Sequence, residues 1–120
     1  MEYEQLCKKI FDSDKQIRFV AVYNSNIKKI AGGIRKGIET LIPESITKLS
    51  VEQSFIRRDT RIRMQEWVGL PKYALAEYAK IKRFTFYLED EHLLLVSTEL
   101  ALDSNLFVAK VSKLIQSYTN

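Results

Sequence analysis

The stretch Ile17-Arg18-Phe19-Val20-Ala21-Val22-Tyr23 decides the fold, together with the turn-forming Asn24-Ser25-Asn26 that follows it. Residues 17–23 are rich in β-branched and aromatic side chains and are apolar on both faces, which is typical of a central strand. The next run, residues 27–33, is more polar. The two runs predict a β-hairpin whose first strand lies inside a sheet and whose second strand lies at its edge.

A second hairpin is predicted further along the chain. Phe84, Phe86 and Leu88 alternate with more polar residues, which is the pattern of a strand with one buried face. An acidic turn at residues 89–91 follows, and then a run at residues 92–97 that is apolar on both faces. The last of these runs therefore predicts a second central strand.

Residues 72–80 are ambiguous. Pro71 and the Ala, Leu and Glu content permit a helix, whereas Tyr73, Leu75 and Tyr78 permit an edge strand, which is the reading we favour. Strands that are apolar on both faces belong at the centre of a sheet and more polar strands at its edges. We therefore predict one mostly antiparallel five-stranded sheet in the order 2-1-5-4-3.

Three amphipathic segments predict helices around this sheet. We expect them over residues 2–12, from 45 or 50 to about 68, and from Asp103 or Ser104 onward. The start of the second helix is left open between residues 45 and 50, because Ser50 and Gln53 have the spacing of a capping box. The chain is thus expected to form a single α+β domain over residues 1–120, in the order α-β-β-α-β-β-β-α.

The long helix carries two apolar stripes. Val51, Phe55 and Ile62 form one, and Leu49, Ile56 and Trp67, with Met64 nearby, form the other. One stripe suffices to cover a sheet, so the second indicates packing against something else, such as another copy of the chain. If the first stripe were exposed and the second packed against the sheet, the first stripe would be the interface instead. We expect the interface residues to be Ile56, Thr60, Met64 and Trp67.

Composition narrows the class of protein only in part. Lys and Arg outnumber Asp and Glu 19 to 15, which is less basic than a dedicated nucleic-acid binder usually is, so charge alone decides nothing. The start Met1-Glu2-Tyr3-Glu4 has no apolar signal region, and no apolar run is long enough to insert in a membrane, so a cytoplasmic location is expected. The single cysteine, Cys7, is expected to be a buried core residue.

No arrangement of residues predicts catalysis or a bound cofactor. Gly32, Gly33 and Gly37 lack the spacing of a phosphate-binding loop and fit a strand end followed by a bend. The acidic residues 89–91 stand beside the only histidine, His92, but fit a solvated turn better than a metal site. We therefore predict no catalytic residue, no metal ligand and no enzyme activity.

The strongest chemical candidate is a basic set on the long helix. Arg57, Arg58 and Arg61 fall within about 100° on a helical wheel, and guanidinium groups bind oxyanions through paired hydrogen bonds. A face of this kind would attract an anion or nucleic acid. The alternative is a solvent-exposed helix face whose positive charge is balanced by acidic neighbours. Binding of single-stranded nucleic acid would also require aromatic side chains between the arginines, and the sequence has none there.

The order of elements resembles that of the Roadblock and longin class of profilin-like domains. The resemblance is carried by the hairpin at residues 19–26 and the late strand at residues 93–97. Residues 31–37 and 73–78 are also similar to an uncharacterised archaeal family of short proteins. The resemblance implies a noncatalytic domain that dimerises through its long helix and an edge strand and serves as a platform for small GTPases or scaffolds.

Three functions follow from these observations. The leading one is a protein-interaction or scaffold module, expected to be a homodimer and to bind a small GTPase or another protein. The second is a sensor of a small molecule or anion, with a pocket between the sheet and residues 34–49 lined by Tyr and Arg side chains. The third is nucleic-acid binding through Arg57, Arg58 and Arg61.

Overall fold

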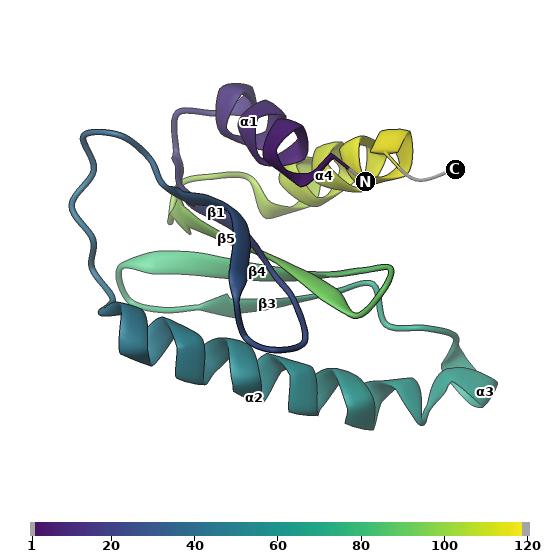
Figure 1. The fold of residues 1–120 in the computed structure, drawn as a ribbon. Coiled ribbons are helices and arrows are strands. Elements are labelled where there is room, and N and C mark those ends of the chain that lie inside the picture. The colour runs from purple at the N-terminus through teal and green to yellow at the C-terminus, as the bar shows by residue number, and fades with distance from the viewer. Residues whose placement is uncertain (1, 119–120) are drawn as a thin grey trace.

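Five strands form one antiparallel sheet, and helices cover both of its faces (Figure 1). The structure is a computed structural model and describes residues 2–118. In chain order the elements are α1 (Tyr3–Ser13), β1 (Ile17–Tyr23), β2 (Lys29–Ile34), α2 (Glu44–Ile62), α3 (Gln65–Val68), β3 (Tyr73–Glu77), β4 (Ile81–Leu88), β5 (His92–Glu99) and α4 (Ser104–Tyr118).

The sheet has the strand order β2-β1-β5-β4-β3, as predicted. The central strands β1 and β5 are the two that are apolar on both faces, and most of their residues are buried. The ambiguous segment at residues 72–80 contains strand β3, which pairs with β4 from Tyr73↔Phe86 to Glu77↔Lys82. The predicted α+β fold is confirmed, with α3 as the one element that was not expected.

The larger core lies between the sheet and the helices α1 and α4, which share one layer (Figure 1). Side chains of β1, β4 and β5 meet those of both helices there, including the fully buried Leu6, Ile10 and Val111. Cys7 is part of this core, as expected. Burial, with a smaller contribution from Glu4, raises the pKa of its thiol to about 12. The thiol is therefore protonated and unreactive at neutral pH.

The opposite face of the sheet carries only a small core under α2. It consists of Ala21, Tyr23, Val51, Leu93 and Leu95, with Phe19, Ile27, Phe55 and Tyr87 packed against it. The rest of this face is polar, because β4 and β5 also place Arg83, Thr85 and Ser97 there. The helix consequently touches the sheet along a narrow line and leaves hollows on both sides of it.

The long helix begins close to the earlier of its two predicted starts but ends sooner than predicted. It begins at Glu44, directly after Pro43, so Ser50 lies inside the helix and does not cap it. It ends at Ile62, short of the predicted residue 68, and a bend at residues 63–64 separates it from α3. Each segment is therefore a separate helix, and Trp67 belongs to α3 rather than to the long helix.

The second strand begins later than predicted, at Lys29, because Ile27 has φ of 60° and sits in the turn. Gly32 lies within this strand with φ of 82°, and a Cβ atom added there would lie 2.0 Å from the carbonyl oxygen of Val20. Its N–H donates a hydrogen bond of 2.8 Å to the carboxylate of Glu4. Glycine is needed here for close approach of two backbones, not for binding a phosphate.

The acidic turn at residues 89–91 is exposed, and Asp90 and Glu91 both adopt positive φ. The His92 ring stacks on Tyr3, with 5.1 Å between ring centroids, and its Nδ1 lies 2.7 Å from the carbonyl oxygen of Asp90. Within residues 2–118, no group of three or more His, Cys, Asp or Glu side chains is placed to hold a metal ion. No helix in the same part of the chain is long and apolar enough to cross a membrane.

Candidate functional site

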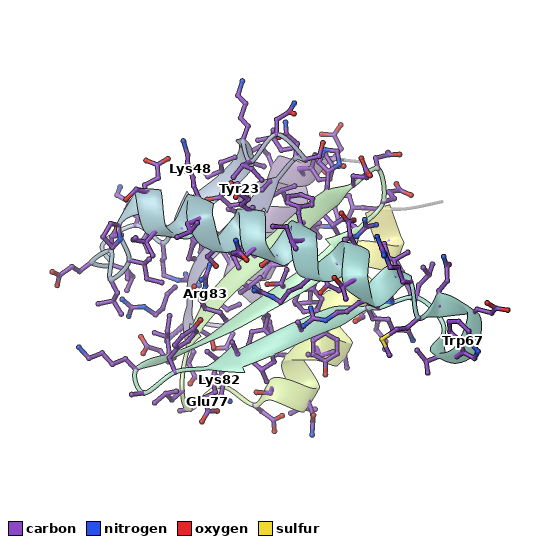
Figure 2. All side chains as sticks on the ribbon, turned by 90° about the horizontal axis from the view of Figure 1, so that it is seen from below. Tyr23, Lys48, Trp67, Glu77, Lys82 and Arg83 are labelled. Carbon is purple, nitrogen blue, oxygen red and sulfur yellow. The ribbon has the colours of Figure 1, made fainter. Side chains whose placement is uncertain are left out.

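The predicted interface residues lie on the side of α2 and α3 that faces away from the sheet. The side chains of Ile56 and Met64 are 52% and 51% exposed, and Trp67 is 76% exposed. Thr60 is also exposed, with its hydroxyl donating a 3.3 Å hydrogen bond to the Ile56 carbonyl. Figure 2 shows Trp67 at the end of the helical layer, beyond the sheet. No partner is present, so the role of these four residues stays a prediction.

Further large apolar side chains extend this exposed surface. They are Ile46 and Leu49 on α2, Val68 on α3, and Leu70 just after it. We call these residues, together with Ile56, Thr60, Met64 and Trp67, the outer face. The other stripe of the long helix packs inward, with Val51 buried and Phe55 against the smaller core. An exposed set of this size on one side of a small domain is typical of an interaction surface.

Strand β3 is an unpaired edge of the sheet. The Tyr78 N–H donates to the Ile81 carbonyl, and the Lys72 carbonyl accepts from the Tyr87 N–H. Because antiparallel pairing alternates, residues 74 and 76 also direct their backbone groups to β4, whereas residues 73, 75 and 77 direct theirs outward. This row of free donors and acceptors is available to another strand.

A polar groove of about 280 Å³ separates α2 from β3 and β4. Arg57, Arg61 and Arg83 line it, and the lining contains no carboxylate. Their guanidinium groups bond to hydroxyls: Arg57 to Ser54 at 3.3 Å, Arg61 to Tyr87 at 2.5 Å, and Arg83 to Ser50 at 2.8 Å and also to Tyr78. We call this feature the arginine groove.

The three arginines predicted to bind an anion do not share one site. Arg57 and Arg61 both line the arginine groove, whereas Arg58 lines a separate hollow with Ile62, Leu70, Pro71, Tyr87, Leu88 and Glu89. The bend after Ile62 brings Leu70 and Pro71 back to this hollow, which a wheel drawn for one straight helix does not anticipate. The anion-binding role of the three residues stays a prediction.

A second cavity, of about 180 Å³, lies on the other side of α2, between the sheet and the connection from β2 to α2. Its walls are mostly apolar, and they include Phe19, Ile34, Leu41, Ile42, Ile81 and Leu95. Its polar side chains are Arg18, Tyr23, Lys29, Thr40, Glu44, Thr47, Arg83 and Ser97. We call it the inner cavity. It occupies the region in which a sensor pocket lined by Tyr and Arg was anticipated.

From the sequence, Arg83 is only one of several basic residues that follow the long helix, and the structure makes it a functional candidate in its own right. It is only 8% exposed, it lines both the arginine groove and the inner cavity, and its Nε has no hydrogen-bond partner. Burial is the main cause that lowers its pKa, and the neighbouring Arg57 adds to the effect. The available signal was its position in β4, where Arg83, Thr85 and Tyr87 alternate with Phe84 and Phe86 on a strand next to the centre of the sheet.

Comparison with known proteins gives no match to any family model or curated protein sequence. Solved structures, in contrast, match over almost the whole chain. MglB from Myxococcus xanthus aligns with a TM-score of 0.71 at 13% identity, covering 99% of this chain and 93% of that one. A Roadblock/LC7 domain from Streptomyces avermitilis aligns with a TM-score of 0.73 at 12% identity, covering 98% and 94%.

The gliding protein MglB from Thermus thermophilus also aligns, with a TM-score of 0.69 at 8% identity, over 94% of this chain and 84% of that one. These likenesses cover 94–99% of this chain. They show that the chain has the Roadblock/LC7 fold, which its element order had already suggested.

Proposed function

We propose that this Roadblock-like chain is a noncatalytic protein-interaction module that forms a homodimer through α2 and the edge of β3. The observation that carries the proposal is the outer face, a group of large exposed apolar side chains on the same chain as an unpaired strand edge. Apolar area removed from water stabilises an interface by about 25 cal/mol per Å². Symmetric pairing would cover these side chains in both copies at once.

A platform for a small GTPase, in the cytoplasm, is the second part of this proposal. It is supported by the likeness to Roadblock domains, whose general role the sequence resemblance implies, and not by any feature specific to a GTPase. Among the similar solved structures, one is described as MglB with a tetrameric arrangement, so a chain of this fold does assemble with others. A dimer would present two copies of each outer surface to a further partner.

The test is the mass in solution, by light scattering, of the wild type and of the double variant Met64→Glu plus Trp67→Glu. One chain has a mass of 14.0 kDa, so we expect about twice this for the wild type and the single-chain value for the variant. Two carboxylates placed in an apolar interface lose their hydration without gaining a partner. Both positions are exposed in the monomer, so circular dichroism should show the variant to be folded.

The matched control is Leu100→Glu plus Leu106→Glu. These two leucines are also exposed, Leu106 to 69%, but they lie at the α4 side of the molecule and outside the outer face. The control variant should keep the wild-type mass. A monomeric wild type, or a loss of mass in both variants alike, would contradict the proposed dimer.

A further inference from the structure

The inner cavity combines apolar walls with a buried cation that the protein does not neutralise. Its walls come from the β2, β1, β5 and β4 part of the sheet, from residues 40–42 and from the start of α2. Arg83 is the most buried cation among its lining residues. A buried guanidinium loses hydration, and proteins normally compensate it with a carboxylate.

The other charged side chains of the cavity, Arg18, Lys29 and Glu44, do not compensate Arg83, and Lys29 is itself a cation. Arg18 forms an ion pair of 2.8 Å with Glu99 and donates a 3.0 Å hydrogen bond to the Glu39 carbonyl. Glu44 is exposed at the start of α2 and lies 4.0 Å from Lys48. The groups that act on the pKa of Arg83 are Tyr78, Tyr23 and Arg57, and none of them is a carboxylate.

The connection over the cavity is held in place at several points. The guanidinium group of Arg35 donates hydrogen bonds to the Ile17 carbonyl at 2.6 Å and to the Phe11 carbonyl at 2.7 Å. The backbone N–H of Arg35 donates to the Arg18 carbonyl at 2.8 Å. With the bond from Arg18 to Glu39, these contacts fix the segment between β2 and α2 against β1. These contacts position the segment that leads directly into the wall residues 40–42, which lowers the rearrangement needed to accept a ligand.

We propose that the inner cavity binds a compact organic carboxylate, whose carboxylate group pairs with Arg83 and whose apolar body lies against Phe19, Leu41 and Leu95. The size fits a small ring or branched chain, because an apolar cavity of about 150 Å³ accommodates benzene. A guanidinium pairs with a carboxylate through a planar, often bidentate contact. A phosphate dianion would leave most of the cavity wall without contact.

This site is independent of the proposed dimer. It lies toward the β2 edge of the sheet and under the buried side of α2, whereas the proposed dimer uses the exposed side of α2 and the edge of β3 at the other end of the strand order. Loss of the dimer therefore leaves the cavity intact, and an empty cavity would leave the dimer proposal unaffected.

The experiment measures binding of benzoate by NMR titration and calorimetry at constant ionic strength. Benzyl alcohol is the neutral probe of the same shape, and inorganic phosphate is the probe of charge without an apolar body. We expect benzoate to bind at least about tenfold more tightly than either, because benzyl alcohol lacks the charge-assisted hydrogen bond to Arg83 and phosphate lacks the apolar contact with the walls. The amide signals of Leu95 and Ser97 should shift. Phosphate binding equal to that of benzoate, or shifts only elsewhere, would overturn the proposal.

Variants separate the role of the charge from that of the cavity. Arg83→Gln should remove the preference for benzoate over benzyl alcohol, whereas the matched Arg57→Gln, outside the inner cavity, should keep it. If Arg83→Gln does not fold, Thr47→Leu provides the second test, because it narrows the cavity from α2 and leaves Arg83 in place. Thr47→Leu should weaken the binding of both benzoate and benzyl alcohol about tenfold or more. Unchanged benzoate affinity in Thr47→Leu would exclude the cavity as the site.

Discussion

At the scale of single residues, Gly32 is the position where the fold tolerates the least change. It combines positive φ with a neighbouring carbonyl oxygen 2.0 Å from where a Cβ would stand. Gly32→Ala should lower the free energy of unfolding by about 3 kcal/mol, measured by urea denaturation. Gly37→Ala is the matched control, since Gly37 has nearly the same φ but nothing within 4 Å, and should cost only about 1 kcal/mol. Equal losses would show that the contact with Val20 does not matter.

Single residues also show what a sequence can predict. The burial of Cys7 follows from its place on the apolar stripe of a helix, and the sequence sufficed to predict it. Arg83 is different, because an arginine in a strand is ordinarily exposed. Its burial depends on Ser50, 33 residues away in the chain, which comes to lie over it only when α2 packs on the sheet. The alternation in β4 indicates which face of the sheet Arg83 lies on, but not that a residue so distant in the chain covers it.

At the scale of elements, the free edge of β3 predicts a contrast between two adjacent proline substitutions. Leu75→Pro removes an N–H that points away from the sheet, so the monomer should stay folded while the proposed dimer dissociates. Ala76→Pro removes an N–H directed at β4 and should lower the free energy of unfolding by about 3 kcal/mol. Light scattering and urea denaturation measure the two effects. A dimer that survives Leu75→Pro would exclude strand pairing at this edge.

The elements themselves were largely predictable, because each strand and helix carries its own periodicity. The segment at residues 73–77 was resolved as a strand by its partner β4, since its own composition also fits a helix. The end of the long helix was missed. Gly69 and Pro71 are strong stop signals, so the helix was predicted to end at residue 68. The chain instead bends five residues earlier, at Arg63 and Met64, where there is neither a glycine nor a proline.

At the scale of the whole molecule, the two faces of the sheet are unequally packed. Only Thr47, Val51 and Ser54 are buried on α2, whereas the other face has the larger core. Hydrogen exchange measured by NMR on the folded monomeric variant Met64→Glu plus Trp67→Glu should therefore show α2 opening at a lower free energy than β1, β5 and α4. Equal protection of all four elements would mean that the narrow contact under α2 is as strong as the main core.

The unequal packing of the two faces of the sheet also explains which parts of the candidate site could be predicted from the sequence. The outer face follows from a second apolar stripe and is readable from periodicity. The inner cavity was anticipated by region and lining, but its dimensions depend on how far α2 stands from the sheet. That distance is set jointly by Val51, Phe55 and the polar residues beneath them, and no single segment determines it.

The two edges of the sheet differ in how readily they can pair with a strand of another copy of the chain. At β2, Gly32 and Gly33 depart from extended geometry, and the carboxylate of Glu4 already occupies an N–H of that strand. At β3 the backbone is regular and free. Strand addition at β3 would join two copies at their regular edges and leave the two irregular β2 edges at the ends of the joined sheet. In the proposed dimer such pairing would stop at two copies, because the irregular β2 edge is a poor template for a further strand.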